Sequence, residues 1–212
     1  MDFLSKYFNY ENGLTISGLT KELNIFFMLE VFKRENKNVL ILANTLYEAN
    51  MYYDSLKTYT DDVCLFPMDD FLTSVAVAIS PDLKIKRLET LDTIRSGKKT
   101  IVVTNLMGYL RYLPNKNDSS NLEFNLSLGN NIKRDEILDI LGKYGYVRES
   151  LVTTTGEYAV RGYIIDLFII DEEHPIRIEF FGDEVDSIRY FDESTQLSIN
   201  EIDSIKIKPY TE

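Results

Sequence analysis

The sequence predicts an α/β domain built on a largely parallel sheet, followed by a small α+β domain with an antiparallel sheet. Three observations lead to this fold class. In residues 1–116, amphipathic stretches alternate with short, continuous apolar runs typical of strands buried on both faces. In residues 117–212, one helical stretch precedes several strand-like runs separated by turns. Between the two lies a polar, turn-rich segment from Leu113 to Asn121 with the composition of a linker.

The first domain, residues 1–116, is predicted from four elements. A helix from about Lys21 to Arg34 precedes a strand over 38–43, and a second buried strand follows over 100–104. Before that strand, Ser80 and Pro81 form an N-cap and first-turn pair, and apolar side chains continue along one helix face at spacings of three: Leu88, Leu91 and Ile94. These elements predict helices packed on a parallel sheet.

The second domain, residues 117–212, begins with an alternating strand over 122–128. Asn131 is a candidate cap for a helix from about Lys133 to Lys143 that ends at Gly145. Strand-like runs follow over 147–153, 158–170, 176–181, 184–191 and 202–207. A helix followed by hairpins predicts an antiparallel sheet with one helix across it.

Composition restricts the classes of partner and compartment. The chain has 212 residues, 44% of them hydrophobic, and a formal net charge of −11. Residues 1–116 carry equal numbers of acidic and basic side chains, so the whole excess of negative charge lies in the second domain. Such a chain repels nucleic acid and anionic membranes unless its basic residues are concentrated. With no apolar run of 18 residues and no leader pattern, we expect a cytoplasmic protein without a membrane partner.

Candidate catalytic side chains are few. The one histidine, His174, precedes Pro175 in a polar stretch that predicts a surface turn. The one cysteine, Cys64, lies in an apolar run, which predicts a buried, inert thiol and no internal disulfide. No cluster of histidine and cysteine has metal-ligand spacing. The sequence therefore predicts neither catalytic residues nor a metal site.

A segment near the N-terminus has part of a phosphate-binding motif. Gly13 and Gly18 have the G-x-x-x-x-G spacing of a P-loop, and Thr20 stands at the Ser or Thr position that ends the motif. Leu19 stands where the motif has the lysine that reaches the β- and γ-phosphates, and Lys21 would face elsewhere on the following helix. The segment is either a degenerate phosphate loop or a plain strand-to-helix turn, and no cofactor is predicted for it.

The second domain carries a longer signal. The runs Gly156 to Phe168, Pro175 to Arg189 and Phe191 to Gln196 resemble the N-terminal region of bacterial transcription-repair coupling factors (Mfd). Earlier pieces agree in the same order: Phe66 to Asp70, Ser80 to Leu91, and Ile101 to Thr104 leading to Leu113-Pro114. The resemblance covers nearly the whole chain from about Gly13.

The excision-repair helicase subunit UvrB is the alternative family, because it shares the run Arg177 to Glu184. Two features favour the coupling factor. UvrB has an intact Gly-Lys-Thr loop where this chain has Gly18-Leu19-Thr20. UvrB also carries a long DNA-gripping hairpin, for which the stretch between Tyr52-Tyr53 and Asp70-Phe71 is too short.

The resemblance implies a binding module without enzyme activity. In the family, the first domain is a degenerate helicase-like fold without ATPase function, and the second docks onto UvrA, the damage-recognition subunit of excision repair. ATP and Mg²⁺ serve the motor of the full-length translocase, whose polymerase-binding and DNA-binding parts follow this region. We therefore expect a truncated piece that lacks the segment completing the first domain, and that is masked by intramolecular contacts in the full protein.

Three residues are candidates for the docking surface. Arg161 and Arg177 are planar donors suited to carboxylates, and Phe181, four residues after Arg177, would share its face of a strand. By resemblance these positions match the UvrA-docking residues of the family. The alternative from the residues alone is that each arginine pairs within its own sheet, with Glu157, Glu179 or Asp183. Tyr163 departs from the family pattern, which has a small residue there.

Overall fold

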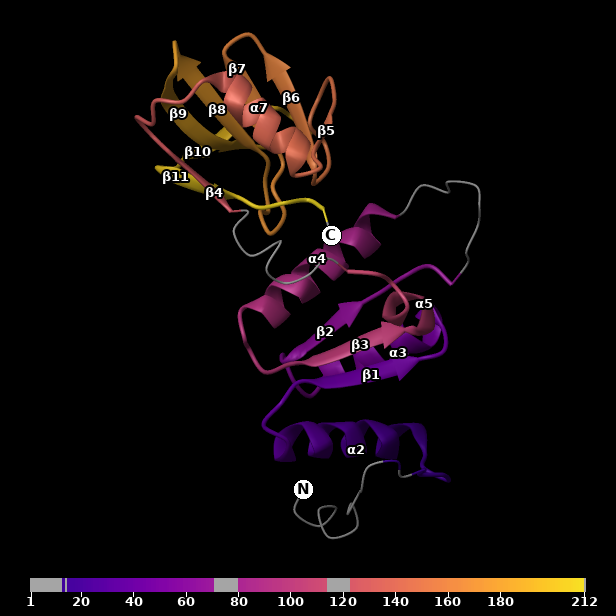
Figure 1. Ribbon diagram of the computed structural model, residues 1–212. Coiled ribbons are helices and arrows are strands. Elements are labelled where there is room, and N and C mark those ends of the chain that lie inside the picture. Colours follow the sequence, from indigo (N-terminus) through magenta and orange to yellow (C-terminus); the bar gives the residue numbers. More distant parts are fainter. Residues whose placement is uncertain (1–12, 14, 71–79, 114–122, 212) are drawn as a thin grey trace. The chain divides into compact units, whose positions relative to one another are not determined.

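The computed structural model describes residues 13, 15–70, 80–113 and 123–211 (Figure 1). The chain forms two compact units, Met1–Tyr112 and Leu113–Glu212. Most of the predicted linker, from Pro114 to Asn121, lies outside the described residues. Each unit is therefore considered by itself.

The first unit is an α/β layer structure. Its elements in chain order are α2 (Lys21–Arg34), β1 (Val39–Ala43), α3 (Leu46–Lys57), β2 (Val63–Phe66), α4 (Pro81–Arg95), β3 (Ile101–Asn105) and α5 (Leu106–Tyr109). The three strands are parallel, in the order β1-β3-β2. The predicted helices and the two predicted strands are present, whereas β2 is a strand that the prediction did not name. It corresponds to the apolar run that contains Cys64.

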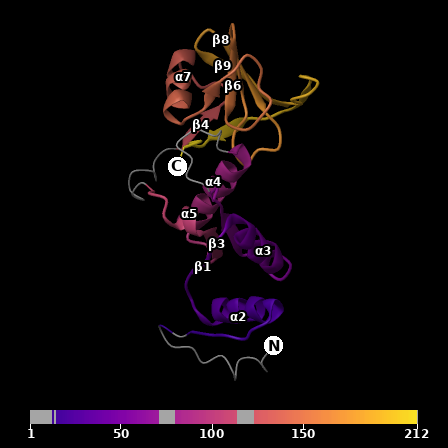
Figure 2. The same ribbon diagram turned by 90° about the vertical axis from the view of Figure 1, so that its right-hand side faces the viewer.

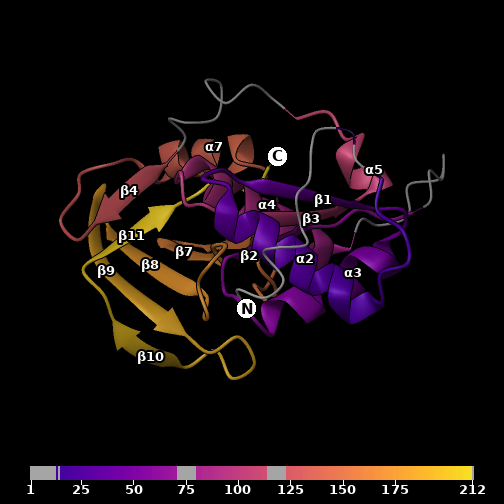
Figure 3. The same ribbon diagram turned by 90° about the horizontal axis from the view of Figure 1, so that it is seen from below.

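Helices lie on both faces of this parallel sheet (Figure 1). Leu40 and Leu42 of β1 are nevertheless exposed, so the prediction that this strand is buried on both faces was wrong, whereas every residue of β3 is buried. Helices α2 and α3 lie on the same side of the strands (Figure 3). Their apolar side chains form one core with alternate residues of the strands: Ile25, Leu29, Phe32, Ala49, Leu56, Ile41, Val63, Leu65, Ile101 and Val103. Helix α4 packs next to β2, where the Thr90 hydroxyl donates to the Leu65 carbonyl at 2.8 Å. Ser80 is the N-cap residue of α4, but its side chain makes no capping hydrogen bond.

The second unit is an α+β structure. Its elements are β4 (Phe124–Ser127), α7 (Arg134–Lys143), β5 (Val147–Arg148), β6 (Glu157–Arg161), β7 (Ile164–Leu167), β8 (Ile176–Phe181), β9 (Glu184–Phe191), β10 (Ser198–Glu201) and β11 (Ser204–Ile207). Six strands form one sheet in the order β10-β9-β8-β7-β6-β5, and β11 pairs with β4. All these pairings are antiparallel except that of β5 with β6. Helix α7 lies beside the six-stranded sheet (Figure 2).

Several predicted boundaries in this unit were wrong. The run 158–170 is two strands, because a two-residue turn at Gly162 and Tyr163 joins the pair Arg161 and Ile164. Gly162 has a φ of +59°, which a residue with a side chain adopts only at a cost. Helix α7 is preceded by Lys133, not Asn131, as its N-cap. Strand β5 has two residues, and β10 was not predicted.

Candidate protein-binding face

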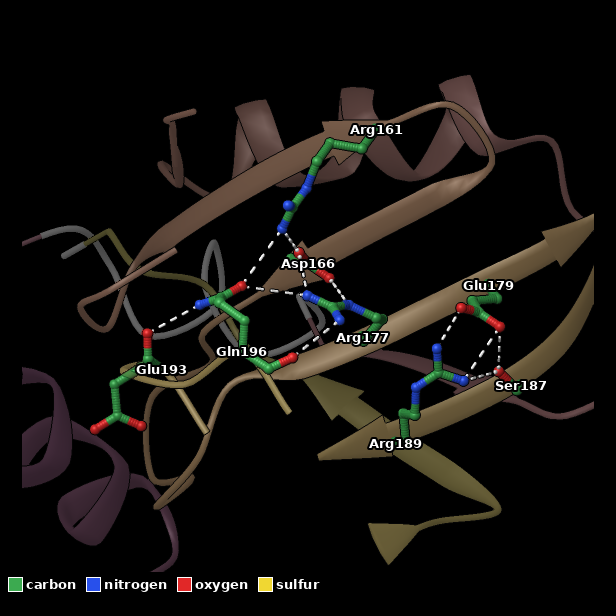
Figure 4. A network of polar contacts seen from close by, with 8 residues as sticks. All are labelled: Arg161, Asp166, Arg177, Glu179, Ser187, Arg189, Glu193 and Gln196. Atoms are coloured by element: carbon green, nitrogen blue, oxygen red, sulfur yellow. Dashed lines mark hydrogen bonds and ion pairs between the residues drawn. The ribbon is translucent and has the colours of Figure 1, made fainter. Parts of the chain in front are cut away.

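Strand pairing gathers four charged side chains on one face of the six-stranded sheet. Asp166 of β7 lies opposite Arg177 of β8, and Arg177 lies opposite Arg189 of β9. On the other side, Asp166 lies opposite Ala159 of β6, so Arg161, two residues further along β6, has the same orientation. Figure 4 looks onto this face and shows the side chains of Arg161 and Arg177 converging on Asp166.

Asp166 is the centre of this cluster. Its side chain is 1% exposed. The Arg177 Nε donates to Oδ1 at 2.6 Å and the Arg177 Nη2 donates to Oδ2 at 2.9 Å, which makes a bidentate pair. The Arg161 Nη2 donates to the same Oδ2. One buried carboxylate therefore holds two guanidinium groups.

Gln196, in the loop between β9 and β10, also contacts both arginines. Its Oε1 accepts from Nη2 of Arg161 at 3.5 Å and from Nη2 of Arg177 at 3.3 Å. The loop has its own hydrogen bonds, because Oδ1 of Asp192 accepts from the backbone N–H and the hydroxyl of Thr195. These hydrogen bonds lower the pKa of Asp192, and the bond from the Thr195 backbone N–H has the larger effect. The loop therefore places Gln196 beside the arginine pair.

The two arginines differ in burial. The Arg177 side chain is 14% exposed, and its guanidinium lies over the buried Phe191 ring, 4.4 Å from the ring centre. Hydrogen bonding to Asp166 raises the pKa of Arg177. The Arg161 side chain is 48% exposed. Arg177 is thus largely enclosed by the fold, whereas Arg161 reaches the surface.

Phe181 lies at the end of β8 on the same face. Ile176, Ile178 and Phe180 alternate into the core, and the residues between them point to the other face. Arg177 and Phe181 therefore share a face, as their four-residue spacing predicts. Phe181 is 81% exposed, which is unusual for a phenylalanine.

The sequence prediction missed the partner of the arginines. Glu157, Glu179 and Asp183 were the acids considered, but in the described residues both arginines pair with Asp166. Glu179 instead pairs with Arg189, and Glu157 accepts hydrogen bonds from Thr153 and Thr154. A signal was present, because Asp166 is a single acid within the apolar run 164–168, and a buried acid requires a partner.

Residues 124–212 match the protein family described as the UvrB interaction domain. The chain is 32% identical to the transcription-repair-coupling factor of Bacillus subtilis over 216 residues, which cover 100% of this chain and 18% of that protein. It is 34% identical to the factor of Staphylococcus aureus strain bovine RF122 over 206 residues, which cover 96% of this chain and 18% of that protein. The chain is homologous to the N-terminal part of transcription-repair-coupling factors. It spans 18% of the length of these relatives.

The possible phosphate loop of this coupling-factor homologue ends in a helix cap. The Thr20 hydroxyl accepts a hydrogen bond from the Leu23 backbone N–H at 3.3 Å, which makes Thr20 the N-cap of α2. Gly13 and Gly18 have φ values of +83° and +79°. Leu14 and residues 1–12 lie outside the described residues, so only the helix side of the predicted turn is described.

Tyr163, the residue that departs from the family pattern, is 68% exposed in the turn between β6 and β7. With Lys133, Arg134 and Gly182 it lines an open cavity of about 340 Å³. The Gly162 carbonyl of the same turn accepts a hydrogen bond from Arg134. The turn therefore packs near the start of α7.

The remaining candidate side chains are placed as follows. His174 lies between β7 and β8 and is 38% exposed, with its Nδ1 3.9 Å from Oε2 of Glu193. Cys64 is half-buried rather than fully buried, and its Sγ is 3.5 Å from the Thr100 hydroxyl. Within the described residues there is no group of three or more potential metal-binding side chains. No helix in the described ranges is long and apolar enough to cross a membrane.

Proposed function

We propose that this chain is a non-catalytic, protein-binding module of a transcription-repair coupling factor. In this proposal it recruits UvrA to RNA polymerase that has stalled at DNA damage. Homology to the coupling factors supports the setting in DNA repair. The observation that carries the proposal is one sheet face: it holds exposed Arg161 against the Arg177 and Asp166 pair, and it carries exposed Phe181 four residues further along β8.

This face has the chemistry of a docking surface. Arginine and aromatic side chains dominate the energetics of protein interfaces. Phe181 offers an exposed apolar ring, and Arg161 offers N–H donors that match a carboxylate on the partner. The second domain carries the whole excess of negative charge, so a cationic patch within it gives selectivity for an acidic partner surface.

Two alternatives have less support. A piece of UvrB is the first, but the coupling factors align over 96% to 100% of this chain. A residual nucleotide-binding domain is the second, but Leu19 stands at the lysine position of the loop and the Thr20 hydroxyl is used as a helix cap. In this proposal, the rest of a full-length protein binds RNA polymerase and DNA, and its motor uses ATP and Mg²⁺. Contacts with that remaining part mask the UvrA-binding face.

Calorimetric titration of the chain with purified UvrA tests the proposal. We expect binding, and a loss of about 2 kcal/mol or more in Phe181→Ala and in Arg161→Ala, as for residues that dominate an interface. Tyr47→Ala and Arg148→Ala are matched controls, because Tyr47 is 80% exposed in the first unit and Arg148 is exposed on β5. We expect these controls to bind as the unchanged chain does.

ATP with Mg²⁺ is titrated separately. No heat of binding is expected. Absence of UvrA binding together with heat from ATP would overturn the adaptor proposal in favour of the nucleotide-binding alternative. Equal losses in the test and control variants would place the docking surface elsewhere.

A further inference from the structure

We infer that Asp166 and Gln196 are positioning residues that hold Arg161 ready for a partner carboxylate, and that Arg177 belongs to this support and does not itself contact the partner. The inference rests on the proposed function, in which this face binds UvrA. It gives different roles to Arg161 and Arg177, which the sequence presents as equivalent candidates for the docking surface.

The first observation is that most N–H donors of Arg177 have hydrogen-bond partners within the chain. An arginine has five N–H donors. Nε and Nη2 bond the two oxygens of Asp166, Nη2 also bonds Oε1 of Gln196, and Nη1 donates to the Gln196 carbonyl at 3.4 Å. Four of the five donors therefore have partners inside the chain. With the Phe191 ring against its guanidinium, Arg177 has little left to offer a partner.

Arg161 is the opposite case. Only its Nη2 is engaged, by Asp166 and Gln196. In the part of the chain that the structure describes, Nε and Nη1 have no hydrogen-bond partner, so three N–H donors remain for an incoming acceptor. The Arg161 side chain is also 48% exposed. It is therefore the arginine of this pair that a partner can reach.

The shared contacts couple the two arginines. Oδ2 of Asp166 and Oε1 of Gln196 each accept from both guanidinium groups. Without the carboxylate, two like charges would face each other and Arg161 would turn toward solvent. A long side chain that is already held in its binding conformation loses less entropy when the partner arrives. Asp166 and Gln196 therefore act on binding through Arg161.

Double-mutant cycles measured by calorimetry with purified UvrA test this inference. We expect Arg161→Gln to weaken binding tenfold or more. We expect Gln196→Ala, Asp166→Asn and Arg177→Lys each to weaken binding several-fold when Arg161 is present, and by less than twofold in the Arg161→Gln background. A merely structural role would weaken binding by the same factor in both backgrounds.

Gln196→Ala carries the test if Asp166→Asn does not fold, because Gln196 lies in a loop and leaves the buried pair intact. Circular dichroism and thermal unfolding of each variant check the fold. Glu179→Gln is the matched control, since it removes a carboxylate that pairs with Arg189 on the same face, and less than a twofold effect is expected.

The outcomes separate the two proposals. If the unchanged chain does not bind UvrA, the proposed function fails and this inference fails with it. If the chain binds and Arg161→Gln weakens binding, but Gln196→Ala has the same effect in both backgrounds or none in either, only the positioning role is overturned.

Discussion

The guanidinium carbon of Arg177 lies 4.4 Å from the centre of the Phe191 ring, while Asp166 accepts hydrogen bonds from Nε and Nη2 of the same group. A cation on an aromatic face and a bidentate carboxylate thus enclose one arginine between β7 and β9. Phe191 itself is fully buried and belongs to a small core with Val152, Ala159 and Phe168. Phe191 and Arg177 therefore contribute to the stability of the sheet, whereas the exposed Phe181 and Arg161 are available for binding.

Replacement of Phe191 is expected to lower the stability of the fold much more than replacement of Phe181. Phe191→Ala should lower the free energy of unfolding by about 3–5 kcal/mol, because it leaves a cavity and removes the ring beneath Arg177. Phe181→Ala should change it by about 0.5 kcal/mol or less, because Phe181 is 81% exposed. Urea unfolding of both variants measures the difference. Equal losses would contradict the assigned burial.

Tyr190 is expected to make the fold sensitive to alkaline pH. Burial, followed by the 2.6 Å hydrogen bond to Glu172, raises the pKa of Tyr190 to about 12. The folded chain keeps this proton where the unfolded chain, with a tyrosine pKa of about 10, releases it. The contribution to stability is therefore fully present below about pH 10 and is lost as the pH rises through about 12.

Ultraviolet titration of tyrosine ionisation tests this expectation. Tyr190→Phe should remove one ionisation step near pH 12. Glu172→Gln should move that step to lower pH, because it removes the negative charge beside the phenol. An unchanged titration in both variants would refute the assignment.

Glu157 is expected to contribute stability on the acid side. Burial alone would raise the pKa of Glu157, but hydrogen bonds from Thr153 and Thr154 outweigh it and lower the pKa. The contribution is present above the unfolded pKa of about 4.3 and is lost as the pH falls through the lower folded value. Glu157→Gln should therefore cost about 1 kcal/mol at neutral pH and less in acid. Urea unfolding at several pH values measures this, and a cost independent of pH would count against it.

Thr20 is expected to act as a helix cap. Thr20→Ala should lower the free energy of unfolding by about 1 kcal/mol, because the Leu23 N–H loses its acceptor. Thr20→Ser should retain most of the stability. Thr45→Ala, which removes the corresponding cap of α3, is the matched control and should cost a similar amount. Unchanged stability in Thr20→Ala, with a loss in Thr45→Ala, would contradict the capping role of the Thr20 hydroxyl.

Much of the fold could be predicted from periodicity. The helix over 21–34 matches α2, and the run 176–181 matches β8, because their apolar spacing is strong and turn residues bound them. The run 158–170 was not divided correctly, because the apolar side chains continue on both sides of the hairpin turn at Gly162. Strand β10 was missed because its four residues are all exposed and carry no burial pattern.

The sequence by itself predicted a division into two parts and a set of candidate binding side chains, and it placed Arg177 and Phe181 on one face of a strand. Only the tertiary structure decided the partner of the arginines. Alternation along a strand gives the face of a residue, but the register between strands decides what lies opposite it. The pairing of β7 with β8 sets Asp166 against Arg177, and the loop after β9 brings Gln196 to both arginines. Those long-range contacts are what distinguish the buried Arg177 from the accessible Arg161.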